Sequence, residues 1–497
     1  MADHQLDDES RRLLQLGSLI QSAIQDFVAC KRQEVVSKTD PGRRGGEEGT
    51  LPSKALLDAQ RTLLAAAGTL TELVSEPQSR LVEVGAQYWE SRALHIVVDK
   101  RVPDLLSQGE NGSMHIKALG DKIGIEHRKL SRLMRCLCSI GIFSEVDEDV
   151  FTNNRISESI VGNEPLRAYI LVYALQPYTC SDYLPRFLND RVKGASYVNE
   201  VTPLQAVLGT EKRSWDWMEE KIKVKHLKEG YRNGSDGNAS YYPGVFGAEL
   251  QKALENASGD DDEQLVDRPE YTMFGTAMIG GGRVYGQAQL YGDFPWASLG
   301  AATIVDVGGG VGGFSLQLSK LYPDLNFIIQ DRAPVLKQAE TEIWPSQHPE
   351  ALVEPRRVRF QPHDFFEPNP VVGADVYWLR YVLHDWSDEY CMRILAAIKP
   401  AMGPRSRILI CDQVMNTTRG CEELKPAPAP LPANWGYYTR YSHQRDFVMM
   451  STINGIERKP TELKHIIERA GLQLKKIWDC RSQVGLVEVV LPGSELD

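Results

Sequence analysis

Apolar positions recur with two different periods along this chain of 497 residues. In the first part they recur every three to four positions over 9–30, 54–75 and 80–108, which predicts amphipathic helices. A polar, glycine-rich stretch over 37–53 lies between the first two and predicts a flexible linker. From roughly residue 300 onward, short apolar runs alternate with helical patterns, which predicts a parallel sheet covered by helices.

Residues 114–151 carry a more specific pattern. A short helix beginning at Met114 ends in a glycine turn, and a second helix runs from Lys129 to Ile140. Residues 141–151 have the alternation of a β-hairpin. Helix, turn, helix and hairpin in this order predict a winged helix.

A winged helix has two interpretations here. It could bind DNA, because four basic side chains lie on the second helix: Arg128, Lys129, Arg132 and Arg135. It could also be a packing or dimerisation module that keeps the shape. The hairpin carries four acids that DNA phosphates would repel: Glu145, Asp147, Glu148 and Asp149. We therefore favour the packing or dimerisation module.

Three further segments are harder to assign. Residues 219–265 are charged and glycine-rich, which predicts an insertion with a helix or two and exposed loops. Residues 416–445 are rich in proline and predict a plain solvent-exposed insertion. Residues 270–291 predict a helix whose apolar face includes Met273 and Met278, and this face could be core or the wall of a flat ligand pocket.

The clearest functional pattern lies between residues 303 and 331. An apolar strand over Thr303–Val307 is followed by five glycines within Gly308–Gly313, a helical pattern from Phe314 to Leu321 and a second strand that leads to Asp331. Strand, glycine turn, helix, strand and acid form the first half of a doubly wound nucleotide-binding sheet.

The same alternation continues to the end of the chain. Five further strands are predicted at 358–361, 374–379, 407–411, 474–478 and 484–490. Helices are predicted at 446–454 and 460–471. The fold class is therefore α/β, a Rossmann-like doubly wound sheet preceded by a mostly helical winged-helix domain.

Composition narrows the class of protein. A net charge of -11 disfavours a general nucleic-acid or acidic-membrane binder, and eight cysteines without a CxxC pair fit free thiols in a reducing compartment. The N-terminus, MADHQLDDES, has no signal-peptide pattern, and no apolar run approaches the roughly 20 residues of a membrane helix. No cluster of His, Asp and Glu suggests a metal site. We expect a cytoplasmic protein that binds no nucleic acid, membrane or metal.

The glycine turn leaves two cofactors open. Gly308, Gly310 and Gly313, with Asp331 about 20 residues on, match the dinucleotide fingerprint, so NAD is the alternative. Asp306 would crowd a pyrophosphate, whereas the cationic groups of S-adenosylmethionine would be attracted to it. We therefore favour S-adenosylmethionine.

Asp364 and Phe365 follow the next strand, at the same edge of the sheet. There a carboxylate could accept from the amino group of an adenine while the ring packs on the base. Asp364 taken alone would more often be a helix N-cap.

A candidate general base stands after the fourth strand of the sheet. His384 lies in His384-Asp385-Trp386, and two acids could orient it: Asp412, at the end of the next strand, and Glu457. A neutral imidazole held by a carboxylate can remove the proton of a phenol, whose pKa is about 10, and the phenolate then attacks the sulfonium methyl.

At these residues the chain resembles the plant-type (caffeate-like) class of S-adenosylmethionine-dependent O-methyltransferases, and in particular fungal members acting on aromatic polyketides. The matching motifs are DVGGGVGG, IIQD, HDFF, LRYVLHDWSDEYC and IERKPTEL. In this order they span nearly all of residues 80–490.

The resemblance implies a role for each matching residue. The donor-binding positions of the family fall on Gly308, Gly310, Gly312, Asp331, Asp364 and Phe365. The family has a lysine near the cofactor, where this chain has Arg380. The catalytic base falls on His384 and one orienting acid on Glu457; the other orienting acid is a glutamate in the family and Asp412 here.

The resemblance also implies where the substrate binds. The family's methionine segment resembles Phe447 to Met450, with Met449 and Met450 as its methionines, and the helix with Met273 and Met278 resembles a pocket wall.

It further implies that the winged-helix region forms a homodimer and that its domain is a dimerisation module. We divide the chain into an N-terminal helix with a flexible linker (1–52), a dimerisation domain (53–190) and a catalytic domain (191–497).

The leading hypothesis is an O-methyltransferase acting on a phenolic hydroxyl of a small aromatic, polyketide-like substrate, with His384 as base. One rival is an enzyme of the same fold that binds S-adenosylmethionine but catalyses dehydration or pericyclisation. The others are an N- or S-methyltransferase, a DNA-binding regulator, which the acidic wing argues against, and an NAD oxidoreductase, which Asp306 argues against.

Overall fold

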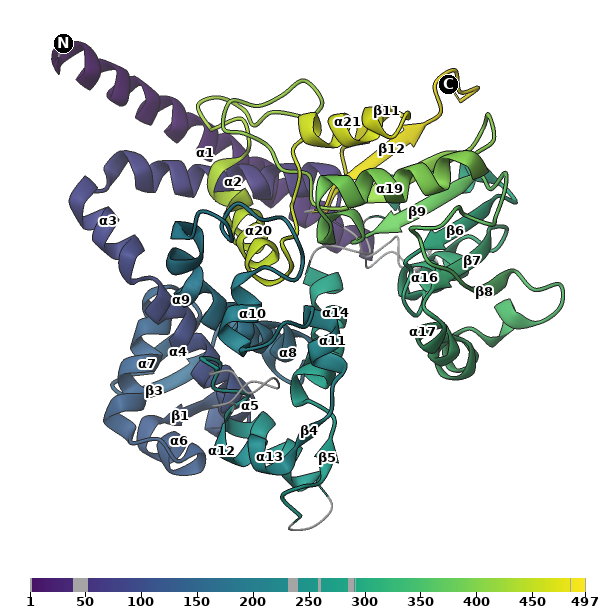
Figure 1. Ribbon diagram of the computed structural model, residues 1–497. Coiled ribbons are helices and arrows are strands. Elements are labelled where there is room, and N and C mark those ends of the chain that lie inside the picture. Colours follow the sequence, from purple (N-terminus) through teal and green to yellow (C-terminus); the bar gives the residue numbers. More distant parts are fainter. Residues whose placement is uncertain are drawn as a thin grey trace. The chain divides into compact units, whose positions relative to one another are not determined.

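A computed structural model describes residues 2–38, 52–230, 240–257, 261–284, 290, 292–482 and 484–496 (Figure 1). The chain divides into two compact units. The sheet unit comprises Met1–Val74, Tyr285–Met450 and Asn454–Asp497, and the helical unit comprises Ser75–Val284 and Ser451–Ile453. These limits differ from the predicted domain boundaries after residues 52 and 190.

A seven-stranded mixed sheet forms the centre of the sheet unit, in the order β11-β12-β10-β9-β6-β7-β8. Its strands are β6 (Thr303–Val307), β7 (Asn326–Asp331), β8 (Val358–Pro362), β9 (Val376–Arg380), β10 (Arg407–Cys411), β11 (Gln473–Trp478) and β12 (Leu486–Val490). The five strands from β8 to β10 are parallel, and β12 runs antiparallel to both of its neighbours. The predicted doubly wound sheet is confirmed.

The order of the strands reverses between β6 and β9. The chain proceeds from β6 to β7 and β8 on one side and returns to β9 and β10 on the other. Because ligands of doubly wound sheets bind at the carboxyl ends of the strands where the order reverses, this edge is the expected site.

Helices cover both faces of the sheet (Figure 1). On one face Phe314, Leu336 and Trp344 are buried from α16 (Gly313–Leu321), α17 (Ala333–Gln338) and α18 (Trp344–Gln347). On the other face Ile394 and Ile466 are buried from α19 (Asp388–Ile398) and α21 (Pro460–Arg469). Burial on both faces explains why the central strands are continuously apolar.

Short helical segments connect these elements. They are η4 (Trp296–Leu299), η5 (Ala339–Ile343), η6 (Pro349–Leu352), η7 (Leu383–Asp385), η8 (Lys399–Ala401), η9 (Gly436–Thr439) and the longer α20 (Arg440–Ile453).

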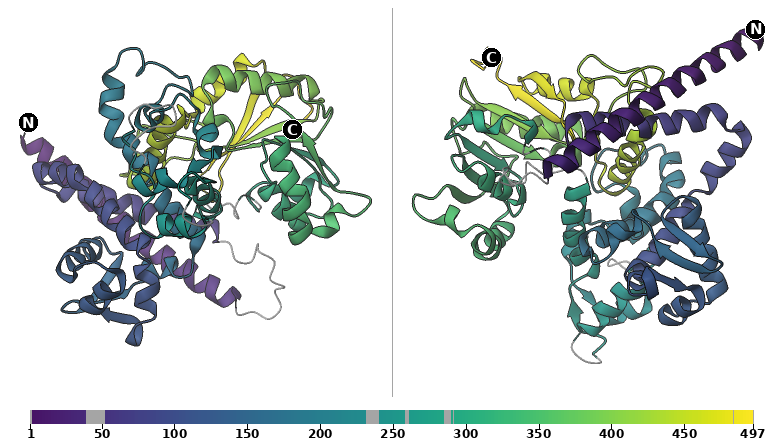
Figure 2. Two further views of the ribbon diagram at one scale, coloured as in Figure 1. Left: turned by 60° about the horizontal axis from the view of Figure 1, so that its bottom comes forward. Right: turned by 180° about the vertical axis from the view of Figure 1, so that it is seen from behind.

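The N-terminal helices α1 (Ala2–Lys38) and α2 (Lys54–Val74) also belong to the sheet unit and lie side by side, as Figure 2 shows. The predicted linker falls largely outside the described residues. The prediction for 416–445 was wrong, because Ala427, Leu431 and Trp435 are buried against apolar residues of the two helices: Leu16, Ala65 and Ala66. The Arg61 guanidinium lies 4.0 Å from the Trp435 ring centroid. Small alanines on α2 thus let the proline-rich segment pack closely instead of remaining in solvent.

The helical unit contains the predicted winged helix. Helix α6 (Ile116–Ile123) ends at Gly124, which has a left-handed φ of 70°, and α7 (His127–Ser139) leads into the hairpin of β2 (Phe143–Asp147) and β3 (Val150–Asn153). Strand β1 (Ser113–His115) pairs with β3 as a third strand.

Further helices surround the winged helix. The pattern over 80–108 becomes three helices, α3 (Pro77–Ala86), α4 (Tyr88–Asp99) and α5 (Val102–Ser107). The break before α5 lies at Arg101, whose φ is 53°. The helical unit also contains η2 (Glu110–Gly112), η3 (Ser157–Ile160), α8 (Glu164–Val172), α9 (Gln176–Asn189) and α14 (Pro269–Val284).

The region between α9 and α14 includes the predicted insertion at 219–265. It contains α10 (Pro203–Leu208), α11 (Ser214–Glu219), β4 (Ile222–Lys223), α12 (Val224–Glu229), α13 (Gly247–Glu255) and β5 (Leu265–Val266). Trp217 and Tyr242 are buried there, and the Tyr242 hydroxyl donates to Glu270 at 2.9 Å. Within 219–265 the prediction of a helix or two is confirmed by α12 and α13, whereas much of the two predicted loops, at 231–239 and 258–260, lies outside the described residues. Among the described helices, none combines the length and apolar character needed to cross a membrane.

Candidate active site

The turn between β6 and α16 requires glycine at the three predicted positions. Gly308, Gly310 and Gly312 have φ values of 70°, 58° and 74°, the left-handed region that side chains disfavour. A Cβ on Gly308 would also lie 3.1 Å from Val382 and 3.5 Å from the Phe365 ring. The turn therefore leaves its main chain accessible at the sheet edge where the strand order reverses.

Asp331 closes the turn from the end of β7. Its Oδ2 accepts from the N–H of Gly310 at 2.8 Å, and its Oδ1 accepts from the N–H of Arg332 at 2.7 Å. Each oxygen of a carboxylate can accept a second hydrogen bond, so Asp331 keeps capacity for the hydroxyls of a ribose.

Asp306 lies buried beneath the same turn and is 3% exposed. Its Oδ2 accepts from the Ser315 hydroxyl at 2.5 Å, and a Cβ on Gly309 would lie 2.5 Å from its carboxyl carbon. Burial raises the pKa of Asp306 to about 6, although the Ser315 hydrogen bond acts in the opposite direction. A cationic ligand at the turn would favour the ionised carboxylate.

Asp364 and Phe365 follow β8, and Arg380 ends β9, two strands that β6 and β7 separate in the sheet. The Phe365 ring borders Gly308, so the predicted pair reaches the glycine turn. Asp364 Oδ1 accepts from the N–H of Phe366 at 3.0 Å, which is a local turn contact. The Arg380 guanidinium lies 4.6 Å from the Tyr381 ring centroid and 5.6 Å from that of Phe314.

The second half of the site surrounds His384, which is 4% exposed in η7. Its Nδ1 lies 3.0 Å from Oε1 of Glu457, and its Nε2 lies 3.2 Å from Oδ1 of Asp385. Asp412 Oδ2 accepts from the main-chain N–H of His384 at 3.2 Å, so it holds the backbone of the residue. An imidazole that donates Nδ1–H to a carboxylate has its free lone pair on Nε2.

The segment after α20 explains why Glu457 reaches this ring. The N–H of Ile456 donates to the His384 carbonyl at 2.8 Å, and a Cβ on Gly455 would lie 2.5 Å from that carbonyl oxygen. The N–H of Glu457 donates to Asp446 at 2.9 Å. Main-chain contacts therefore fix the carboxylate beside the imidazole.

Arg445 of α20 lies beside both His384 and Glu457 and is 8% exposed. Its Nη2 lies 3.4 Å from Nδ1 of His384 and 3.5 Å from Oε1 of Glu457. We name the group of His384, Asp385, Asp412, Arg445 and Glu457 the His384 cluster.

The charges of the His384 cluster shift the pKa values of its members. Burial lowers the pKa of His384, but the carboxylates of Glu457 and Asp385 outweigh it and raise the pKa to about 9. Burial raises the pKa of Asp385 to about 6, and burial also raises that of Asp412. Burial would raise the pKa of Glu457, yet His384 and Arg445 hold it below its ordinary value.

The predicted substrate residues divide between the two units. Met449 and Met450 are half-buried on α20, Phe447 on the same helix is 60% exposed, and Met449 packs against Gly455. Met273 is buried and Met278 is exposed on α14 of the helical unit.

Three residues near His384 were not singled out from the sequence. Asp385 adjoins His384 in the HDW block, and that adjacency was an available signal. Tyr381 has a φ of 53°, and its ring centroid lies 5.4 Å from that of His384. Tyr381 lies in the LRYVLHDWSDEYC motif, so its position was a further available signal, whereas Arg445 belongs to none of the matching motifs and its contacts appear only in the fold.

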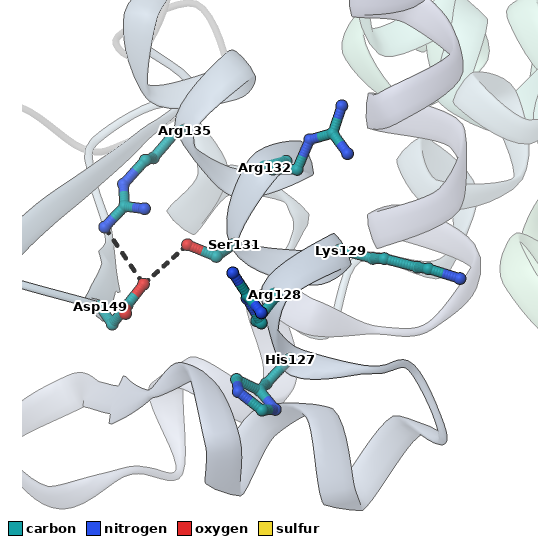
Figure 3. Close-up of a pocket in the computed structure, with 7 residues that line it drawn as sticks. All are labelled: His127, Arg128, Lys129, Ser131, Arg132, Arg135 and Asp149. Atoms are coloured by element: carbon teal, nitrogen blue, oxygen red, sulfur yellow. Dashed lines mark hydrogen bonds and ion pairs between the residues drawn. The ribbon is translucent and has the colours of Figure 1, made fainter.

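The helical unit has a basic cavity of about 410 Å³ on α7 (Figure 3). Arg135 contacts Glu145 at 2.6 Å and Asp149 at 3.1 Å, and the Ser131 hydroxyl donates to Asp149 at 2.7 Å. We name Arg135, Glu145 and Asp149 the wing cluster. The acids of the wing thus engage an arginine of the helix.

Comparisons with known proteins agree with this geometry. Residues 225–473 match the O-methyltransferase domain and residues 82–163 match the O-methyltransferase dimerisation domain. The O-methyltransferase tpcA of Aspergillus fumigatus is 51% identical over 484 residues, covering 97% of each chain. The O-methyltransferase gedA of Aspergillus terreus is 52% identical over 483 residues, covering 96% of each chain.

A solved structure has the same fold. CalO1, a methyltransferase in calicheamicin biosynthesis in its S-adenosylhomocysteine-bound form, has a TM-score of 0.58 at 22% identity, covering 84% of this chain and 100% of that one. The glycine turn and the strand-end acids fit such a donor, since a side chain at Gly308 would crowd the sheet edge where the strand order reverses. The chain therefore belongs to the S-adenosylmethionine-dependent O-methyltransferase family.

Proposed function

We propose that the protein methylates a phenolic hydroxyl of an aromatic, polyketide-derived metabolite, with His384 as the general base. The observation that carries this proposal is the buried contact of 3.0 Å between Nδ1 of His384 and Oε1 of Glu457. Because Nδ1 of His384 faces Glu457, Nε2 is the nitrogen that receives the hydroxyl proton. A phenol requires such a base near neutral pH, because its pKa of about 10 leaves little phenolate.

We propose that the donor is held by the residues of the glycine turn and its neighbouring strand ends. Asp331 accepts from the ribose hydroxyls, Asp306 faces the cationic end, and Asp364 and Phe365 hold the adenine. Arg380 lies at the end of the next strand, close to Tyr381. The donor supplies a methyl group on a positively charged sulfur, which the phenolate attacks in line.

On the acceptor side, Glu457 fixes the tautomer and the orientation of the His384 ring, and Asp412 holds its backbone. Phe447, Met449 and Met450 are the proposed contacts on α20, and Met273 and Met278 are those on α14. Methionine and phenylalanine suit a flat aromatic substrate because they offer polarisable surface without polar demands.

The match of residues 82–163 to a dimerisation domain supports a homodimer formed through the N-terminal region. Sedimentation at micromolar concentration should give a dimer. A monomer at that concentration would contradict the assembly.

The decisive experiment incubates the full-length protein with methyl-labelled S-adenosylmethionine and a panel of phenolic polyketides. His384→Ala should lower transfer to the best acceptor by about 10²–10⁴-fold. His465→Ala is the matched control, because His465 is exposed on α21. Transfer by His384→Ala within tenfold of wild type would refute the role of the base. Conversion of the acceptor without label would favour a non-methylating reaction.

Donor binding is tested separately by calorimetry with S-adenosylhomocysteine. Asp331→Ala should weaken binding markedly, whereas Asp324→Ala, an exposed aspartate just before β7, should not. Tight binding of NADH instead would refute the assignment of the donor residues.

A further inference from the structure

Arg445 is held in place independently of any ligand. Its Nη1 lies 3.4 Å from Oε1 of Gln413, and Gln413 in turn donates to the Ser442 hydroxyl. Its guanidinium lies 5.1 Å from the centroid of the Tyr381 ring, which is itself tilted by 35° against the His384 ring. The arginine is thus anchored by side chains of three different segments.

The charges that face His384 come from every element around it. Asp385 lies in η7, Asp412 follows β10, Glu457 follows α20, and Arg445 lies on α20 itself. Tyr381 follows β9. Arg458 acts on Asp412 and Glu457 from a greater distance and pairs directly with Asp388 at 2.8 Å. Among the ion pairs of the described residues, the pair between Arg445 and Glu457 alone brings a cation against the carboxylate that holds the ring.

Three carboxylates beside one imidazole create a difficulty for a base. They favour the protonated ring, and a protonated ring cannot accept the proton of a hydroxyl. A positive charge in contact with both His384 and Glu457 acts in the opposite direction, because it disfavours the imidazolium and stabilises the ionised carboxylate.

We propose that Arg445 is a positioning residue for the base, which holds Glu457 against the Nδ1 edge of His384 and counteracts the carboxylates that favour the imidazolium. The proposal rests on the proposed function of His384. Arg445 itself exchanges no proton and acts through Glu457 and the ring.

The pKa of His384 can be measured without an acceptor. In full-length protein with ring-¹³C histidine, the His384 resonance is identified by its loss in His384→Gln. Removal of the positive charge in Arg445→Met should raise the pKa of His384 by roughly 1–3 units, the range for a charge within about 4–6 Å. Arg445→Lys keeps the charge and should return the pKa close to that of wild type. Arg440→Met, on the exposed face of the same helix, is the matched control and should leave it unchanged.

The same variants should differ in the pH dependence of kcat. Arg445→Met should move the acid limb to higher pH in step with the pKa of His384, with Arg445→Lys restoring it. Binding of S-adenosylhomocysteine reports whether each variant folds, and Arg445→Gln replaces Arg445→Met if the latter does not bind it. An unchanged pKa of His384 in a folded Arg445→Met or Arg445→Gln would overturn the proposal.

The two proposals fail in different experiments. If His384→Ala retains methyl transfer, the proposed base is wrong whatever the titration gives. If His384→Ala is inactive but the titration is unmoved by Arg445→Met, the base stands and the role of Arg445 is refuted.

Discussion

Two clusters in this chain combine an arginine with carboxylates, and they differ chiefly in burial. In the wing cluster the Arg135 side chain is 47% exposed, and water and salt screen its contacts with Glu145 and Asp149. In the His384 cluster the Arg445 side chain is 10% exposed and Glu457 is fully buried. An ion pair between arginine and a carboxylate thus serves packing at the surface in the wing cluster. In the buried His384 cluster the same kind of pair can adjust the affinity of the imidazole for a proton.

The wing cluster and the His384 cluster should differ most in their effect on catalysis. Glu457→Gln should lower kcat by about 10³-fold, within the range of a positioned general base, because an amide no longer fixes the imidazole as a proton acceptor. Glu145→Gln in the wing cluster should leave kcat unchanged. Rates with saturating donor and acceptor give kcat for both variants. A kcat of Glu457→Gln within tenfold of wild type would show that the two clusters do not differ in catalysis as expected.

The next difference concerns stability. Arg445→Met removes one of the two cationic groups in contact with the buried Glu457 and should lower the free energy of unfolding by about 3 kcal/mol. Arg135→Met should leave the midpoint of urea unfolding close to that of wild type, because its partners are hydrated after the change. Equal losses in the two variants would show that burial is not what distinguishes the clusters.

A third difference should appear in the pH dependence of stability. The pKa of His384 is about 9 in the folded protein against an ordinary value of 6.5. Its stabilising contribution is therefore complete below pH 6.5 and is lost as the pH rises through 9. Between pH 7 and 9 wild type should lose about 2 kcal/mol more than His384→Gln. Urea unfolding at each pH measures this difference, and parallel curves for the two proteins would contradict it.

The smallest effect concerns salt. Raising the ionic strength from 0.1 M to 1 M shortens the Debye length from about 10 Å to 3 Å. The coupling between Arg135 and Glu145 in a double-mutant cycle should then disappear, whereas that between Arg445 and Glu457 should persist. Loss of both couplings would place the His384 cluster in contact with solvent.

The two halves of the active site differed in how far the sequence could predict them. The glycine turn is a local structure, because the left-handed φ values of Gly308, Gly310 and Gly312 are demands of consecutive residues. His384 and Glu457 were paired through motifs, and the structure brings them to 3.0 Å.

Other features could not be predicted because they depend on contacts between distant segments. Arg445 lies in an unremarkable helix, and its neighbours Gln413, Tyr381 and His384 come from three other segments. The proline-rich stretch has the composition of an exposed loop, and only α2 shows why Trp435 is buried. The composition of a segment does not show which other segments will pack against it, and that packing determines whether the segment is buried.

The packing of α1 and α2 against residues 427–435 has a consequence for synthesis of the protein. Leu16 leaves the ribosome first, and its neighbour Trp435 follows roughly 400 residues later, about 20–80 s at 5–20 residues per second. During that time Ala427, Leu431 and Trp435, which pack against the helical pair in the folded protein, have not yet been made. The packing of α1 and α2 on this segment is therefore completed only late in synthesis.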